Sequence, residues 1–315
     1  MKFPEISVIM AVHNTEKYLT EAIDSILNQT FRNFEFIIIN DVSTDNSLKI
    51  IKRYMKNDKR IKLINNIKNV GPAISRNNGL RIAKGKYIAI MDSDDISLPK
   101  RFEIQYDFLQ KNTDIFLIGG QIIRIDEHGS YISKSNLILD ERLIKEKLRR
   151  EVCIFHPTIM FRNEGIHLYR KKFIYAQDYD FYLRLLSKNK RILNIPRILV
   201  KYRISPNAIS WSKSGKQRAL LEKAKEFYKQ RLIYGKDDYK IFEPKSLSNI
   251  YKPNDKIILE AEMRANLKIN DLKKVRIFYR KYFENYGFIN KFTIYYILSL
   301  TNKKFINLLR KIISS

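Results

Sequence analysis

Short uninterrupted apolar runs recur at regular intervals through the first hundred residues of the chain. They occupy residues 5–12, 34–40, 61–64 and 87–91. Runs of this length, rich in Ile, Val and Phe, are typical of strands buried on both faces. The hydrophobic pattern therefore predicts a sheet whose strands follow one another along the chain.

Helices are predicted between these runs. One begins after Thr15 as its N-cap, one follows the turn-forming residues 41–45, and one covers residues 71–83. The pair Lys84 and Gly85 predicts a glycine C-cap for the third helix. Strands that alternate with helices of this length predict an α/β fold with a mostly parallel sheet and helices on both faces.

The mixed pattern continues to about residue 212. Helices are predicted at 98–111 and 141–150, and another helix is predicted to start within 176–185. A strand is predicted at 115–125, an extended run at 153–162 and a loop at 202–210. From about Lys213 the chain is rich in Lys and Tyr and lacks strand alternation. We therefore expect two domains, an α/β domain over 1–212 and a basic, mainly helical region over 213–315.

An acidic turn follows the run at 87–91. Asp92, Ser93, Asp94 and Asp95 place three carboxylates within four positions. Carboxylates this close raise one another's pKa unless a cation lies among them. A hard divalent ion that also binds a substrate phosphate is one interpretation, and an N-cap for the next helix is the other.

Polar residues also follow two other predicted strands. His13 and Asn14 follow the run at 5–12, and Asp41 follows the run at 34–40. In parallel sheets, ligands bind outside the carboxyl ends of the strands, and all three polar clusters lie there. This convergence favours a binding site over isolated helix caps.

Two further positions in the second half of the chain carry candidate acid–base groups. His156 precedes Pro157 in an extended segment, and a lone His is more often structural than catalytic, by about two to one. Asp178 and Asp180 lie in the first turn of a predicted helix. Such acids either complement the helix dipole or supply a rigidly held general base.

Composition sets the environment and the partners. The single Cys153 excludes a disulfide framework, and the formal net charge of +27 attracts polyanions unless the Lys residues are simply solvated. Residues 288–315 combine Lys and Arg with many apolar side chains and contain no acid. This basic tail either contacts an anionic membrane surface or packs as a helical hairpin.

No signal peptide is visible and the apolar runs are too short to span a bilayer. We therefore expect a cytoplasmic protein, peripheral on the inner face of the cell membrane if its tail binds there.

Five motifs in order give the chain a family resemblance. They are residues 7–14 (SVIMAVHN), 39–45 (INDVSTD), 71–77 (GPAISRN), 91–95 (MDSDD) and 177–180 (QDYD). In this order and spacing, the first two hundred residues resemble the inverting glycosyltransferases of family two, of the bacterial surface-glycan type. The resemblance implies a GT-A fold, which is a Rossmann-like α/β architecture; the last hundred residues lie outside it.

The resemblance implies a donor site for a nucleotide sugar, with UDP as the expected nucleotide. Its residues would be Ala11, His13, Glu16, Asp41, Arg76, Asp92 and Ser93, with Asp41 accepting a hydrogen bond from the base. Asp94, together with Asp92, would bind Mn²⁺ or Mg²⁺ that bridges the sugar diphosphate. The ion would act as a Lewis acid on the leaving diphosphate.

The resemblance also implies an acceptor side. Asp178 would be the general base, and the residues bordering the acceptor or diphosphate would be Asp95, His156, Gln177 and Arg203. Many relatives carry Glu where this chain has Gln177. Without that negative neighbour, Asp178 would have a lower pKa than its counterpart in relatives.

The leading hypothesis is an inverting, metal-dependent glycosyltransferase acting on a glycan or lipid-linked acceptor. A nucleotidyltransferase is one alternative, but residues 11–14 lack the Gly or Lys that a triphosphate loop needs. A non-catalytic basic module that binds membranes or polyanions is another, and it leaves the converging carboxylates unexplained. No nucleic-acid motif is present, so no nucleic-acid partner is expected.

Overall fold

The computed structural model describes residues 3–165, 168–204, 214–247 and 271–287, with isolated residues between 256 and 300. They belong to two compact units. The first comprises Met1–Ile204 with Tyr228–Asp237, and the second Ser205–Phe227 with Asp238–Ser315. The predicted boundary between 212 and 213 falls in 205–213, outside the described residues.

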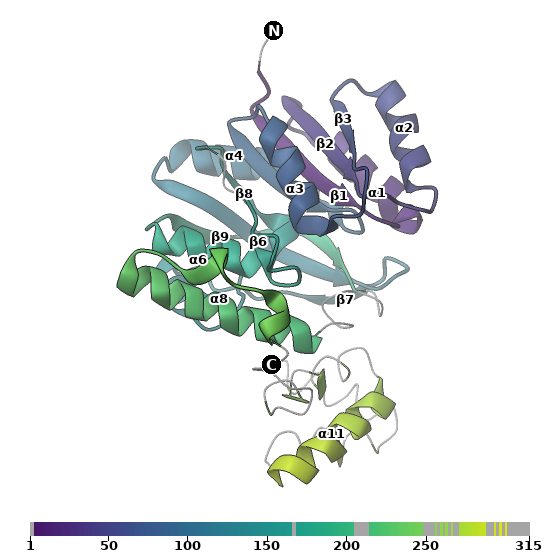
Figure 1. Cartoon of the computed structure of the whole chain (residues 1–315). Coiled ribbons are helices and arrows are strands. Elements are labelled where there is room, and N and C mark those ends of the chain that lie inside the picture. Colours follow the sequence, from purple (N-terminus) through teal and green to yellow (C-terminus); the bar gives the residue numbers. More distant parts are fainter. Residues whose placement is uncertain are drawn as a thin grey trace. The chain divides into compact units, whose positions relative to one another are not determined.

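The first unit alternates strands and helices along the chain (Figure 1). Its strands are β1 (Ile6–Val12), β2 (Phe34–Asn40), β3 (Ile61–Asn65), β4 (Tyr87–Asp92), β5 (Ile96–Ser97), β6 (Ile115–Ile125), β7 (Tyr131–Lys134), β8 (Met160–Arg162) and β9 (Arg191–Arg203). Its helices are α1 (Glu16–Leu27), α2 (Ser47–Asn57), α3 (Gly71–Ile82), α4 (Arg101–Lys111), α5 (Glu141–Leu148) and α6 (Gln177–Ser187). The predicted α/β fold class is confirmed.

The strands form one sheet in the order β3-β2-β1-β4-β8-β6-β9-β5, with β7 paired to β6. The pairs from β3 to β4 are parallel, as is the pair β6–β9. Strands β5, β7 and β8 join their neighbours antiparallel. The parallel part of the sheet is therefore the part in which β1, β2 and β4 end side by side.

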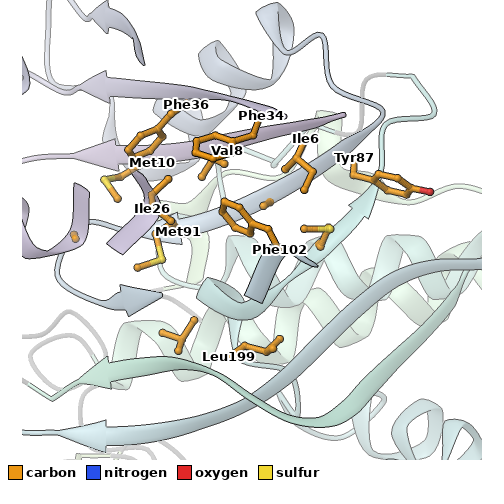
Figure 2. Packing of buried hydrophobic residues seen from close by; sticks show 14 of the residues in the cluster. Ile6, Val8, Met10, Ile26, Phe34, Phe36, Tyr87, Met91, Phe102 and Leu199 are labelled. Carbon is orange, nitrogen blue, oxygen red and sulfur yellow. The ribbon is translucent and has the colours of Figure 1, made fainter. Parts of the chain in front are cut away.

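One face of the parallel part carries the main hydrophobic core. Alternate residues of β1, namely Ile6, Val8 and Met10, are fully buried against α1 and α4. Figure 2 shows Phe102 of α4 and Ile26 of α1 packed against them. Each such side chain contributes about 1.5–3 kcal/mol when removed from water, so this layer fixes α1 and α4 on one face.

Helix α3 packs on the opposite face, against β1 and β2 (Figure 1). The close approach depends on Gly79, where an added Cβ would lie 2.8 Å from the Cδ1 atom of Ile39. The register pairs Ala11 of β1 with Asp92 of β4. Because side chains alternate along a strand, Asp92 faces the same side as Ile9, which is the side that α3 covers.

Three local predictions are wrong. Gly85 is not a C-cap, because α3 ends at Ile82 with an extended residue after it; its amide donates to Ser7 Oγ (2.8 Å), and an added Cβ would collide with the Ser7 backbone. Helix α4 begins at Arg101 instead of residue 98, because the Leu98 amide bonds to Leu199 O of β9 (2.9 Å). The predicted loop at 202–210 is wrong at its first two residues, which belong to β9.

The second unit contains most of α8 (Ser214–Tyr234) and all of α11 (Leu272–Tyr286). Asp271 caps α11 by accepting from the Lys274 amide (3.1 Å), and Tyr279 and Tyr282 pack with Leu259 and Met263. No described helix is long and apolar enough to cross a membrane. Most of the predicted basic tail at 288–315 lies outside the described residues.

Candidate active site

The carboxyl ends of β1, β2 and β4 bring the predicted polar clusters together. His13 Nδ1 lies 2.8 Å from the backbone oxygen of Asp41, which joins the ends of β1 and β2. Ala11 is paired with Ile39 on one side and with Asp92 on the other. The predicted convergence of His13, Asp41 and Asp92 at one edge of the sheet is therefore present.

The backbone at this edge is strained at two positions. Asn14 has a φ angle of 52° and Val42 one of 57°. The left-handed region is unfavourable for any residue with a Cβ, and most of all for a β-branched one such as Val. Strain of this kind persists where the surroundings enforce it, commonly at functional sites. Here Asn14 Oδ1 accepts from the Thr44 amide (2.8 Å), which holds the two turns together.

The start of α1 is held by the segment after β2. Thr15 is the N-cap residue of α1, as predicted, but its side chain makes no capping hydrogen bond. Instead, Ser47 Oγ accepts from the Thr15 amide (3.1 Å) and Asp45 Oδ2 from the Glu16 amide (3.0 Å). Glu16 is exposed, and its Oε2 accepts from the Asn46 amide (2.7 Å). Glu16 therefore lies at the rim of the site and ties α1 to α2.

Asp41 is buried and anchors α3. Its Oδ1 accepts from the Val70 amide and from Asn66 Nδ2 (both 2.9 Å), and its Oδ2 from the Gly71 amide (2.8 Å). A carboxylate at a helix N-terminus is favoured by the free amides and the helix dipole. Asp41 thus fixes the helix that carries Arg76, and its contact with a nucleotide base stays a prediction.

Arg76 is the centre of the site. It is 7% exposed, and its Nη2 donates to Asp92 Oδ1 at 2.6 Å. Burial opposes its charge, but the neighbouring carboxylates, Asp92 first, outweigh burial and raise the pKa of Arg76. Among the described residues, its Nε and Nη1 atoms have no hydrogen-bond partner although they are buried. Buried donors without partners are rare, so these two point to an anionic ligand.

The acidic turn does not cap the next helix. Ser97 closes β5 before α4 starts at Arg101, whose N-cap residue Lys100 makes no side-chain capping bond. Burial and the charge of Asp92 raise the pKa of Asp94 to about 6. Burial and the charge of Asp94 raise the pKa of Asp95 well above its usual range. The carboxylates of the turn therefore repel one another, and the nearby Arg76 and Arg203 offset that repulsion only in part.

The donor set at this turn fits a hard divalent cation. Asp92 and Asp94 offer carboxylate oxygens, and Mg²⁺ typically takes one or two such groups and completes its shell with phosphate oxygens and water. In the part of the chain that the structure describes, no group of three or more His, Cys, Asp or Glu residues is arranged to hold a metal. Ser93, between the two aspartates, is buried.

Arg203 at the end of β9 braces the acidic turn from behind. Its amide donates to Asp95 Oδ1 (2.8 Å), its Nε to Asp94 O (2.9 Å) and its Nη2 to Glu21 Oε2 (2.6 Å). Its Nη1 reaches Asp126 O (3.1 Å). The predicted neighbours Asp95 and Arg203 thus lie together. The guanidinium is engaged on every side by the protein, so a direct contact with the diphosphate stays a prediction.

The two acids at the start of α6 have different surroundings. Asp180 is fully buried and pairs with Arg184 Nε at 2.9 Å. Asp178 is partly exposed, and its Oδ1 accepts from the Tyr179 amide (2.8 Å). Burial raises the pKa of Asp178, and the Tyr179 amide and the charge of Arg76 counteract part of that rise. Asp178 is therefore the acid that shares the site with Arg76.

Gln177 and His156 lie near Asp178, and both side chains hydrogen-bond within the protein. With its side-chain amide oriented so that oxygen and nitrogen both have suitable partners, Gln177 donates to Phe173 O (3.0 Å) and to Ile174 O. His156 is buried, with Tyr182 Oη 2.9 Å from Nδ1 and Tyr169 Oη 3.1 Å from Nε2. Burial and the charge of Arg76 lower the pKa of His156 well below its usual value. The ring is a neutral part of the wall.

Sequence reasoning missed the tyrosines around the site. Burial raises the pKa of Tyr169, Tyr182 and Tyr202, and the charge of Asp178 adds to the rise in each. For Tyr182 a signal exists in the sequence, since it lies four residues after Asp178 and therefore on the same helix face. Tyr169 and Tyr202 are brought in by loop and strand packing, for which the sequence pattern gives no signal.

Comparisons with known proteins identify the family. A model described as Glycosyl transferase family 2 matches residues 7–175, more than half of the 315-residue chain. The chain belongs to glycosyltransferase family 2, and it is a glycosyltransferase of the bacterial surface-glycan type. The family resemblance seen in its motifs is thus confirmed.

The regions of similarity cover most of the length of several relatives. An uncharacterized glycosyltransferase of Methanocaldococcus jannaschii is 41% identical over 212 residues, covering 66% of this chain and 73% of the relative. The Escherichia coli O-antigen biosynthesis glycosyltransferase WbnJ is 36% identical over 234 residues, covering 72% and 91%. The E. coli glucosyltransferase WfgD is 31% identical over 209 residues, covering 66% and 80%.

A solved structure shares the fold. The 1–349 segment of S. aureus TarS in complex with UDP superposes with a TM-score of 0.58 at 18% identity, covering 88% of this chain and 81% of TarS. At this level of identity the likeness concerns the fold alone, and it supports the GT-A assignment.

Proposed function

We propose that this glycosyltransferase moves a sugar from a UDP-linked donor to a hydroxyl of a glycan or lipid-linked acceptor, with inversion at the anomeric carbon. The observation that carries the proposal is the position of Arg76. Its guanidinium is bonded to Asp92 of the acidic turn and lies within electrostatic reach of Asp178 on α6. One buried cation thus links the predicted donor side to the predicted general base.

The names of similar proteins support the donor and the acceptor class. WfgD is named as a transferase from UDP-Glc to GlcNAc linked to diphosphoundecaprenol, and WbnJ as an enzyme of O-antigen biosynthesis. TarS, which shares the fold, has structures with UDP and with UDP-GlcNAc. We extend a UDP-linked donor and a lipid-linked glycan acceptor to this chain on that basis.

The proposed reaction is a single displacement. The carboxylate of Asp178 removes the proton from the acceptor hydroxyl, whose oxygen bonds to the anomeric carbon of the donor. The bond from that carbon to the diphosphate breaks, and the nucleoside diphosphate leaves with the electron pair. A raised pKa suits Asp178 to this task, since a general base works best when its pKa is near the working pH.

The residues around the acidic turn have defined roles in this proposal. Asp92 and Asp94 would hold Mn²⁺ or Mg²⁺, and such an ion supplies Lewis-acid neutralisation of the leaving diphosphate. The buried Nε and Nη1 donors of Arg76 would bind diphosphate oxygens, for which a planar guanidinium is well shaped. Arg203 keeps the turn in place through the backbone of Asp94.

A calorimetric titration tests the donor half of the proposal. UDP, GDP and CDP are titrated with and without Mn²⁺ into the wild type, Asp94→Ala and Asp107→Ala. Asp107 is an exposed acid on α4 and serves as the matched control. We expect UDP to bind most tightly, to need the metal, and to lose at least about tenfold in affinity in Asp94→Ala only.

Two outcomes count against the donor assignment. Equal affinity with and without metal, or for Asp94→Ala and the wild type, would remove the metal site from the acidic turn. Absence of binding by all three nucleotides would leave the nucleotide-sugar donor without support.

A further inference from the structure

A pocket of about 240 Å³ lies in the first unit, outside the site described above. Its walls are Arg124 of β6, residues 135–138 after β7, Lys147 of α5 and residues 151–155. This volume is below the roughly 300–1,000 Å³ of pockets that hold drug-sized ligands. The pocket therefore suits one chemical group of a larger substrate.

Arg124 gives the pocket its charge. The guanidinium lies 5.5 Å from the centre of the Phe155 ring, and its Nη1 reaches Ser133 Oγ at 3.3 Å. Among the described residues no carboxylate pairs with it, and burial lowers its pKa. A partly buried cation without a counter-charge is costly, and an anion in the pocket would offset that cost.

The pocket is held in shape by Asn194 of β9. Its Nδ2 donates to Ile138 O and to Cys153 O, both at 3.1 Å, which joins the two walls. Asn194 is 4% exposed. At the mouth, Lys147 pairs with Glu151 (3.2 Å) on the exposed surface. The partly buried positive group inside is thus Arg124, and Lys147 adds a screened charge at the rim.

The pocket adjoins the active site through two aromatic rings. The ring centres of Phe155 and Tyr202 are 6.2 Å apart. Tyr202 directly precedes Arg203, whose amide donates to Asp95 Oδ1 (2.8 Å). Burial and the nearby carboxylates, Asp95 first, raise the pKa of Tyr202. Next to Lys147 of the pocket wall, Leu148 O at the end of α5 accepts from Tyr179 Oη at the start of α6 (2.7 Å). The pocket therefore lies beside the segment that carries the proposed general base.

We propose that this pocket binds an anionic group of the acceptor, a phosphate or a carboxylate, through Arg124. The inference rests on the proposed function, since it assigns the group to the acceptor of that reaction. The Phe155 ring offers an apolar face to the carbon skeleton that bears the anion. Arg124 would thus select acceptors by a charge that lies away from the reacting hydroxyl.

Anion binding tests the assignment directly. Methyl phosphate and glucuronate are titrated into the full chain, with and without saturating UDP and Mn²⁺, while the Nε–Hε signal of Arg124 is followed by NMR. Glucose serves as the neutral control ligand. The variants are Arg124→Gln, Arg124→Lys and Arg142→Gln, the last being an exposed Arg on α5 paired with Glu146. Thermal unfolding confirms that each variant is folded.

We expect one anion to bind saturably at millimolar concentration, and the identity of that anion distinguishes a phosphate from a carboxylate acceptor. Arg124→Gln weakens this binding about tenfold or more, Arg124→Lys less, and Arg142→Gln leaves it unchanged. Binding of neither anion, or equal binding by Arg124→Gln and the wild type, overturns the inference. UDP binding is scored separately, so failure of the proposed function is a distinct result.

Discussion

At the scale of single residues, Arg76 and the carboxylates around it decide the electrostatics of the site. Asp92 is neutralised by a direct bond to Arg76. Beside it, Asp94 is partly buried and Asp95 is buried, and neither forms an ion pair within the described residues. The chain therefore stores repulsion at the acidic turn. Binding of a divalent ion with a diphosphate would relieve that repulsion.

Burial of Asp94 and its repulsion by Asp92 together predict a pH dependence of stability. The folded pKa of Asp94, about 6, exceeds the unfolded value of about 3.9. Protonated Asp94 is thus favoured by folding, and its contribution is present below about pH 4 and lost as pH rises through 6. In EDTA, Asp94→Asn should match the wild type near pH 4 and be more stable above pH 6.

Chemical denaturation at several pH values measures this difference in the free energy of unfolding. Added Mn²⁺ should close the gap by stabilising the wild type alone. A wild type that is more stable than Asp94→Asn above pH 6 in EDTA would show that the acidic turn is not repulsive.

Much of the residue-level site was predictable, since His13, Asp41, Asp92 and Asp178 were found from their places after strands or at a helix start. The family resemblance placed Arg76 near the acidic turn. The sequence pattern alone does not show its pairing with Asp92, because that pairing depends on α3 crossing the sheet at Gly79. The hydrogen bonds from Gln177 to the backbone oxygens of Phe173 and Ile174 could not be predicted either. No local pattern states which backbone oxygens a side-chain amide meets.

At the scale of elements, the strands that build the site were predictable and the strand that braces it was not. Strands β1, β2 and β4 are continuous apolar runs, whose burial on both faces the sequence reveals directly. Strand β9 contains Pro196 and several basic residues, and its partner β6 changes register at Gly120 and Gln121. A Pro within a run argues against a strand, so the sequence pattern does not predict β9.

Helix α6 positions Asp178 through a buried charge cluster. Asp180 accepts from Arg184 at 2.9 Å and lies 3.6 Å from Arg170, which also pairs with Asp237 at 2.7 Å. When one partner is removed from such a cluster, the remaining buried charge has no counter-charge to offset its desolvation, and the folded state is destabilised. The cluster therefore anchors the first turn of α6.

We predict that Asp180→Asn lowers the free energy of unfolding by about 3–5 kcal/mol. The matched control is Glu146→Gln, which breaks an exposed ion pair with Arg142 and should cost at most about 1 kcal/mol. Urea denaturation followed by circular dichroism provides both values. Equal, small losses for the two variants would show that the cluster does not anchor α6.

At the scale of the whole molecule, the net charge of +27 is the strongest feature that the catalytic proposal leaves unused. A lipid-linked acceptor lies at a membrane, and a basic protein is attracted to an anionic surface. We therefore propose peripheral binding to the inner face of the cell membrane. The basic tail at 288–315 remains the expected contact.

Co-sedimentation with vesicles tests the membrane proposal. The full chain should sediment with vesicles that contain phosphatidylglycerol and stay in solution with phosphatidylcholine alone. Binding should fall steeply as salt is raised, because the Debye length shrinks from about 10 Å at 0.1 M to about 3 Å at 1 M. Absence of binding to anionic vesicles at low salt would contradict the proposal.

The most direct test of the whole account is the rate of UDP release from a UDP-sugar in the presence of a lipid-linked acceptor, with UDP affinity measured alongside. Asp178→Asn is compared with the wild type and with Asp107→Asn. We predict a loss of about 10²–10⁴-fold in rate for Asp178→Asn alone, with UDP affinity unchanged. Transfer by Asp178→Asn at the wild-type rate would contradict Asp178 as the base and, with it, the mechanism proposed for this site.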